Sequence, residues 1–186
     1  MKVIICPGVH ETQLTESFLN SIFRIEQSEK LQAIADYEVF PTLKYPAYSP
    51  VDLYRWLTAS EVLTDELLFI CFSAGVVGGF GAATTLQLQG VTIKAFVAID
   101  GWGVPLFADF PIHRLSHDYF THWSSAFLGA GNNNFYCDPP VDHLTLWETP
   151  EICQGWIVSE DRDRKELKTK SSAKDYLLNI LLSSDR

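Results

Sequence analysis

Cysteine is scarce in this sequence, and no two cysteines have the close spacing of a zinc ribbon. The 186 residues contain four cysteines, scattered along the chain as Cys6, Cys71, Cys137 and Cys153. Three of them lie in or beside apolar stretches typical of strands, so we expect buried thiols and no disulfide framework. Free thiols are typical of a reducing compartment, which makes the cytoplasm the expected location.

Basic charge and long apolar runs are also lacking. Lysine and arginine number 14 against 23 aspartates and glutamates, a net charge of −9. Such a charge repels phosphate backbones and anionic lipid head groups, so we expect no nucleic-acid partner. No stretch approaches the length of a membrane span, and the first apolar run, 3–6, is too short for a signal peptide. We therefore expect no membrane span.

Four short apolar runs alternate with helical patterns in the first hundred residues. The runs are 3–6, 37–40, 67–72 and 94–99. Strands that alternate with helices indicate a parallel sheet with right-handed crossovers. The sequence therefore predicts a single α/β domain over 1–186, with a mostly parallel central sheet flanked by helices. Functional residues are expected at the carboxyl ends of the strands.

The second half of the chain is less regular. Segment 101–131 is rich in aromatic residues and histidine, and we expect a small irregular, lid-like segment there. Further on, we expect a helical stretch over 144–159 and a loop or mobile arm over 160–172. The apolar residues of 173–183 recur on one helical face and predict a helix that closes the core.

The strongest functional motif is the run Phe-Ile-Cys-Phe-Ser-Ala-Gly-Val-Val-Gly-Gly over 69–79. A buried strand breaks there through Ser73 into a helix of small residues. The run resembles the nucleophile elbow of the α/β-hydrolases, G-x-S-x-G, with Cys71 in place of the first glycine. In such an elbow the serine hydroxyl is exposed and the next amide, of Ala74, faces the developing oxyanion. The alternative is an ordinary turn in which serine caps the helix.

We expect a further short strand over 135–137, and a histidine that follows it is the candidate base. A group that takes the serine proton and returns it to the leaving group must titrate near neutral pH, which points to imidazole. His143 is followed by Glu148 and by the pair Pro150-Glu151, an order similar to the catalytic histidine and terminal helix of many α/β-hydrolases. The alternative is an isolated surface or capping histidine.

The acid of such a triad must hold the distal imidazole nitrogen. We favour Asp100, at the end of the strand after the elbow helix, where some lipases of the resembled family carry their acid. Asp138 and Asp142 are too close in sequence to His143 for the required approach, and Asp118 lies in the irregular segment. The alternative for Asp100 is a local Asp-Gly turn.

The resemblance also implies a second oxyanion donor after the first strand. The backbone amide of Val9 is the candidate, although the Pro-Gly pair before it is equally compatible with a plain turn. We expect the substrate pocket to include side chains from this loop and from the aromatic segment: His10, Trp102, His117 and Trp123. Aromatic walls favour an apolar acyl group or an aromatic ester, unless these side chains simply complete a core.

The predicted function is a serine hydrolase that acts on a small-molecule carboxylic ester or thioester through an acyl-enzyme, without cofactor or metal. One alternative is a non-catalytic binding protein of the α/β-hydrolase-like fold. The other is a metal-assisted hydrolase built on His113, His117 and His122 with Asp118. His113 and His117 are four residues apart, a spacing that places two zinc ligands on one face of a helix.

Overall fold

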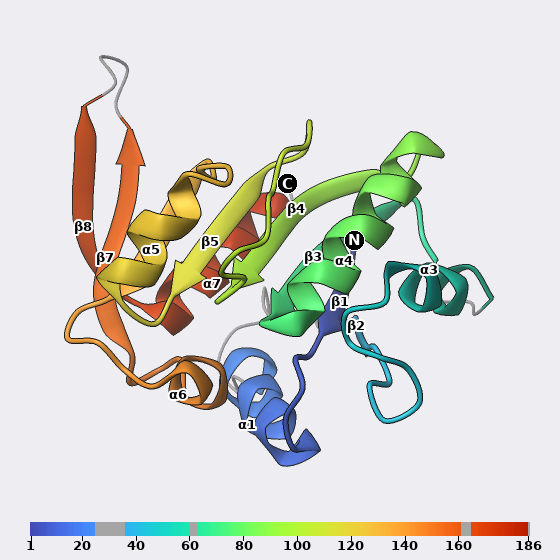
Figure 1. Cartoon of the computed structure of the whole chain (residues 1–186), viewed down its shortest axis with the longest axis horizontal. Helices are drawn as coiled ribbons and strands as arrows, with labels where there is room; N and C mark the ends of the chain where they lie inside the picture. The colour runs from blue at the N-terminus through green and yellow to red at the C-terminus, as the bar shows by residue number, and fades with distance from the viewer. Residues whose placement is uncertain (25–35, 60–62, 161–164, 186) are drawn as a thin grey trace.

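The described part of the chain folds around one mixed β-sheet. The computed structural model describes residues 1–24, 36–59, 63–160 and 165–185. Its eight strands follow the order β2-β1-β3-β4-β5-β6-β7-β8, with helices on both faces (Figure 1). Strands β1 to β6 pair in parallel. Strand β7 runs in the opposite direction and pairs antiparallel with both β6 and β8. The predicted α/β class and the mostly parallel sheet are confirmed.

The elements alternate along the first two thirds of the chain. In order they are β1 (Lys2–Cys6), α1 (Thr12–Phe23), β2 (Tyr37–Val39), α3 (Pro50–Ala59), β3 (Glu66–Phe72), α4 (Ala74–Leu88), β4 (Thr92–Ile99), β5 (Ile112–Ser116), α5 (Tyr119–Ala126), β6 (Asn133–Cys137), α6 (His143–Glu148), β7 (Gln154–Glu160), β8 (Glu166–Ser172) and α7 (Ala173–Ser184).

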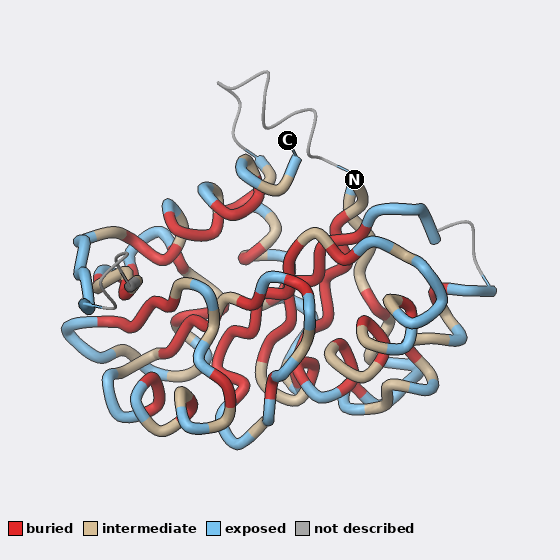
Figure 2. The backbone as a smooth tube through the Cα atoms, turned by 90° about the horizontal axis from the view of Figure 1, so that it is seen from above, coloured by how far each residue is buried: buried red, intermediate tan, exposed pale blue. Residues whose placement is uncertain are grey.

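The sheet separates two apolar cores. Successive side chains of a strand point to opposite faces, so Val3 and Ile5 of β1 join one core while Ile4 and Cys6 join the other. Helices α1, α6 and α7 cover the first face, and α3 and α4 cover the second. Figure 2 shows the buried segments gathered along the strands and on the inner sides of the helices.

The cysteines are buried, as the sequence predicted. All four carry free thiols inside the cores. Cys6 of β1 and Cys71 of β3 are direct neighbours in the parallel register. Burial, with the hydrogen bond and charge of Cys6, raises the pKa of Cys71 well above its usual value. Its sulfur is therefore a packing group and not a reactive thiolate.

The segment 101–131, expected to be irregular and lid-like, is irregular before residue 112 but then contributes to the sheet. It contains β5, which lies between β4 and β6, and the helix α5 that packs on β5 and β6. The strand was missed because polar residues interrupt its apolar pattern. Arg114 is one of them, and it is 3% exposed. Its guanidinium donates hydrogen bonds to the carbonyl oxygens of Gly129, Val104 and Leu128 at 2.8, 3.0 and 3.0 Å, so the burial of the charge is compensated.

Two further expectations in the C-terminal third were wrong. The helix over 144–159 is limited to α6, and β7 begins at Gln154, where Gly155 allows it to approach β6 closely. A Cβ on Gly155 would lie 2.0 Å from the carbonyl oxygen of Tyr136. Of the loop expected over 160–172, residues 161–164 lie outside the described residues, and 166–172 form the edge strand β8, whose exposed side chains include Lys168 and Lys170. Charged side chains are typical of an edge strand. The predicted closing helix is α7.

Within the residues that the structure describes, no helix combines the length and the apolar character that crossing a membrane requires.

The parallel strands bring their carboxyl ends to one edge of the sheet. Ser73 follows β3, Asp100 follows β4 and His117 follows β5, while His143 begins the helix after β6. The strand order reverses between β1 and β3, and the loop after β1 passes close to Ser73 there. A Cβ on Gly8 would lie 3.0 Å from the Cβ of Ser73. A switch point of this kind is where open parallel sheets form their crevices.

Candidate active site

Ser73 lies in a strained turn between β3 and α4. Its backbone angles are φ 52° and ψ −120°, and a positive φ is uncommon for a residue with a Cβ. Its amide donates a hydrogen bond to the carbonyl oxygen of Ile99 at 2.9 Å. Its hydroxyl caps no amide of α4. The alternative of an ordinary capping serine therefore does not describe this turn.

Two glycines leave space around the turn. One of them, Gly79, leaves the space for Cys71, which stands in place of the first glycine of the G-x-S-x-G pattern. A Cβ on Gly75 would lie 2.2 Å from the carbonyl oxygen of Cys6, so the helix start can approach β1 only with glycine there. A Cβ on Gly79 would lie 2.3 Å from the sulfur of Cys71. The Cys71 side chain thus occupies space that Gly79 leaves open, and the strand-to-helix turn forms with cysteine at this position.

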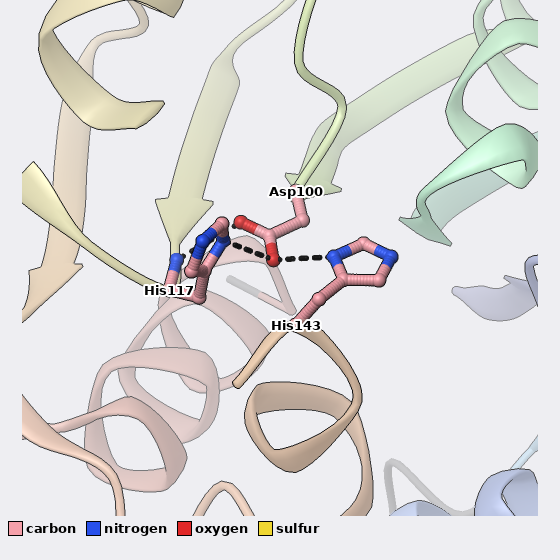
Figure 3. A group of neighbouring side chains, drawn as sticks. All are labelled: Asp100, His117 and His143. Carbon is pink, nitrogen blue, oxygen red and sulfur yellow. Dashed lines mark hydrogen bonds and ion pairs between the residues drawn. The ribbon is translucent and has the colours of Figure 1, made fainter. Parts of the chain in front are cut away.

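Asp100 is the buried centre of the polar groups at this edge. Its side chain is 1% exposed, and its φ of 50° is again in the left-handed region. The Nδ1–H of His143 donates to its Oδ2 at 2.7 Å. The His117 side chain donates from Nδ1 to the same oxygen at 2.8 Å, and the His117 amide donates to Oδ1 at 2.9 Å (Figure 3). Burial favours a raised pKa for Asp100, but the hydrogen bonds from His117 and His143 outweigh it and lower the pKa.

His143 has the orientation that a general base requires. Because a carboxylate can only accept, the Nδ1 that faces Asp100 carries the hydrogen and Nε2 keeps the basic lone pair. Figure 3 shows this second nitrogen pointing away from Asp100. The ring stacks on Phe72, the residue before Ser73, with centroids 4.6 Å apart and planes at 25°. The His143 imidazole is therefore held at one nitrogen by the Asp100 carboxylate and on one face by Phe72 of β3.

A cavity of about 330 Å³ opens at this edge. Its walls come from the turn at Ser73 and the start of α4, and from the segments that follow the other strands. The lining residues are Ser73, Ala74, Val77, Asp100, Trp102, Val104, His117, Thr121 and His143. Ser73, Asp100 and His143, the three residues predicted from the sequence, thus share one cavity with the predicted Ala74, Trp102 and His117. Two of the three alternative acids accept hydrogen bonds from groups other than His143. Asp118 accepts the Thr121 amide at 2.6 Å, and Asp138 accepts the Trp156 indole at 2.9 Å.

Three other predicted site residues do not line this cavity. Val9 is 78% exposed in the loop after β1, and it is Gly8 that approaches Ser73. His10 lines a separate, largely apolar cavity of about 360 Å³ between α1 and the segment after β2. Trp123 is 49% exposed and contacts Phe127 on the outer side of α5. These positions follow from the paths of the loop and the helix, which local sequence does not specify.

The histidines proposed as a metal site do not converge. His113 and His117 belong to a strand and its end, not to a helix, so their spacing separates them along β5. His113 faces Tyr176, with Nδ1 3.2 Å from the phenol oxygen, and His122 stacks on Tyr136 of β6. Of the described residues, the set that does converge is Asp100, His117 and His143, whose ligand atoms lie within 4.8 Å of one another.

His117 has a role that the sequence did not indicate. It was expected in the substrate pocket, and it does line the cavity, but its main contact is with Asp100. That hydrogen bond raises the pKa of His117 despite partial burial, and the charges of Asp118 and Asp142 act in the same direction. Recognising β5 as a strand would have placed His117 at the carboxyl edge beside Asp100.

The chain matches no known protein-family model, and no curated protein is significantly similar to it. What is established is an α/β protein with a largely parallel sheet and, where the parallel strands end, a cavity lined by both polar and apolar side chains.

Proposed function

We propose that this protein is a serine hydrolase of the α/β-hydrolase type that cleaves a carboxylic ester or thioester. The main support is the 2.7 Å hydrogen bond from His143 to the buried Asp100, in a cavity that also contains the strained Ser73. The chain order serine, aspartate, histidine is the order that this type of hydrolase uses.

In the first step, the Ser73 hydroxyl attacks the substrate carbonyl carbon while the Nε2 of His143 takes the hydroxyl proton. Asp100 keeps the imidazole in the required tautomer and stabilises the imidazolium. The amide of Ala74 donates to the oxyanion of the tetrahedral intermediate, and a single donor of this kind is worth about 3 kcal/mol. The protonated His143 then gives its proton to the departing alkoxide or thiolate, which leaves Ser73 acylated.

In the second step, His143 removes a proton from water, and the hydroxide so formed attacks the acyl carbonyl. The intermediate collapses, the carboxylic acid leaves, and the proton returns to the Ser73 oxygen. The amide of Val9, in the loop whose Gly8 lies beside Ser73, is the second oxyanion donor in this proposal. The apolar side chains of Val77, Trp102 and Val104 favour an apolar acyl group or an aromatic ester.

Labelling by a fluorophosphonate tests the nucleophile directly. We expect the folded protein to be labelled at Ser73 and to hydrolyse short soluble aryl esters or thioesters. Both properties should disappear in Ser73→Ala. Ser183→Ala is the matched control, because that hydroxyl donates only to the Ile180 carbonyl at the end of α7. An unlabelled, correctly folded wild-type protein would contradict the proposal and favour a non-catalytic binding protein.

A metal-assisted hydrolase is the second candidate, and the convergence of Asp100, His117 and His143 within 4.8 Å is the observation that favours it. Two imidazoles and one carboxylate are a donor set that suits zinc. Metal analysis of protein prepared without a histidine tag separates the two candidates. Stoichiometric metal, with activity that chelation abolishes and Ser73→Ala retains, would favour the second.

A further inference from the structure

The carboxylate of Asp100 is held by two groups of a single residue. The His117 amide donates to Oδ1 at 2.9 Å, and the His117 Nδ1 donates to Oδ2 at 2.8 Å. These two bonds hold both oxygens and so define the plane of the carboxylate. The third contact of the carboxylate is the 2.7 Å bond from His143 to Oδ2.

The two imidazoles approach Oδ2 from different sides. Their ring planes are at 81° and their centroids 6.1 Å apart, and Figure 3 shows Asp100 between them. A carboxylate oxygen can accept two hydrogen bonds, so the His117 bond and the His143 bond are compatible. Each His117 bond therefore favours the carboxylate orientation that also receives His143.

The two histidines differ in where their second nitrogen lies. The Nε2 of His143 points away from Asp100. The Nε2 of His117 lies 3.7 Å from a carboxylate oxygen of Asp118, so both nitrogens of this imidazole face carboxylates. That position suits a group that holds an acid in place and does not suit a base for Ser73.

We propose that His117 is a positioning residue of the hydrolase, whose imidazole holds the Asp100 carboxylate in the orientation that receives the Nδ1–H of His143. The proposal rests on the proposed function. Asp100 has two rotatable side-chain bonds, and without the His117 imidazole the carboxylate keeps only the amide bond to Oδ1 and the bond from His143, whose own ring can move with it. The His143 ring would then lose its fixed orientation and Ser73 its effective base.

Two amide substitutions separate this role from a simple contribution to the cavity wall. The side-chain nitrogen of asparagine can occupy the place of the imidazole Nδ1, whereas that of glutamine corresponds to Nε2. His117→Asn therefore keeps the donor to Oδ2, and His117→Gln moves it. His117→Ala removes the donor altogether but leaves the backbone bond to Oδ1.

The first experiment measures kcat and KM on a soluble aryl ester, with thermal unfolding of each variant as a check on folding. We expect His117→Ala and His117→Gln to lower kcat roughly 10- to 100-fold, the value of a hydrogen bond to a charged group. KM should change less than about twofold, and His117→Asn should recover most of the loss. Equal kcat values for the asparagine and glutamine variants, or a change confined to KM, would overturn the proposal.

A second experiment does not depend on catalysis. Imidazole nitrogen NMR should show a protected Nδ1–H on His143 in the wild type and in His117→Asn. The same signal should exchange rapidly in His117→Ala and His117→Gln. If the wild type is inactive but this pattern holds, the proposed function fails while the positioning role stands. A protected His143 signal in all four proteins would overturn the positioning role.

Discussion

Two histidines, one near the start of β5 and one just past its end, have pKa values shifted in opposite directions because their surroundings differ. His113, near the start of β5, faces Tyr176 of α7, whose hydroxyl donates to the carbonyl oxygen of Asn133. Burial lowers the pKa of His113 to about 4. His117, just past the end of the strand, faces Asp100, and that contact raises its pKa.

The sheet therefore has two chemically distinct regions. We call Ser73, Asp100, His117 and His143 the carboxyl edge, and His113, Tyr176 and Asn133 the sheet interior. At the edge, groups from separate strand ends share one carboxylate, so charge is stabilised. In the interior, neutral partners and burial disfavour charge. Changes at the edge should therefore affect activity, and changes in the interior should affect stability.

The largest expected effect comes from Asp100→Asn at the edge. Asparagine tolerates the positive φ of this position, so the fold should be retained. Its amide cannot replace the carboxylate that holds the His143 tautomer, and kcat should fall about 10³- to 10⁴-fold. Asp138→Asn is the control, because the asparagine side-chain oxygen can still accept the hydrogen bond from the Trp156 indole, and its kcat should stay within about threefold. Comparable kcat values for the two variants would contradict a role of the Asp100 carboxylate in activity.

The next effect is a loss of stability in acid through His113. Its folded pKa of about 4 lies below the value of about 6.5 for an unfolded chain, so the unfolded state takes up the proton first. The stability that neutral His113 contributes is complete above pH ~6.5 and is lost as the pH falls toward 4, about 3 kcal/mol in total.

Urea unfolding at several pH values measures this loss, and His113→Gln should lose less stability over the same range. A titration of the His113 ring followed by NMR in the wild type provides a second measurement that needs no variant. A midpoint near 6.5 in the folded protein would show that the interior does not disfavour the charged imidazole.

A smaller effect is expected where α4 packs on β3, next to Ser73. Gly79→Ala places a methyl group against the Cys71 sulfur, and we expect the free energy of unfolding to fall by about 2 kcal/mol. Cys71→Gly in the same chain should relieve the clash, so the two changes should couple by about 1 kcal/mol or more. Leu88→Ala, 89% exposed on the same helix, should change stability by less than about 0.5 kcal/mol. If the effects of Gly79→Ala and Cys71→Gly were strictly additive, Gly79 would not be leaving space for Cys71.

The smallest effect is expected from Tyr176→Phe in the interior. The change removes the 2.6 Å hydrogen bond to Asn133, and it should lower the free energy of unfolding by about 1 to 2 kcal/mol with kcat unchanged. Tyr54→Phe is the matched control, since that hydroxyl bonds to Gln89 at the surface. A fall in kcat without a loss of stability would show that the interior takes part in the chemistry.

The first four strands were predictable because the two buried faces require continuous apolar runs. Residues 67–72 form such a run, and β3 is found there. β5 was missed because His113, Arg114 and Ser116 interrupt its pattern, and the carbonyl groups that compensate Arg114 come from distant turns. The sequence did not predict β7 and β8, because these segments become strands by pairing with antiparallel neighbours more than through their own composition.

The candidate site was predictable to the extent that each residue follows a strand or opens a helix. Ser73, Asp100 and His143 were chosen on that ground, and the structure brings them into one cavity. The misassignment of β5 concealed the contact of His117 with Asp100. It also suggested a helical spacing for His113 and His117 that does not exist.

By itself, the sequence determined the alternation of strands and helices, the burial of the cysteines and the small residues around Ser73, because these depend on local polarity, side-chain volume and backbone freedom. Only the tertiary structure decided which imidazoles meet Asp100 and which face solvent or an apolar wall. The physical reason is that a carboxylate at a strand end selects its partners by distance and direction in space, and both are set by the order of the strands in the sheet.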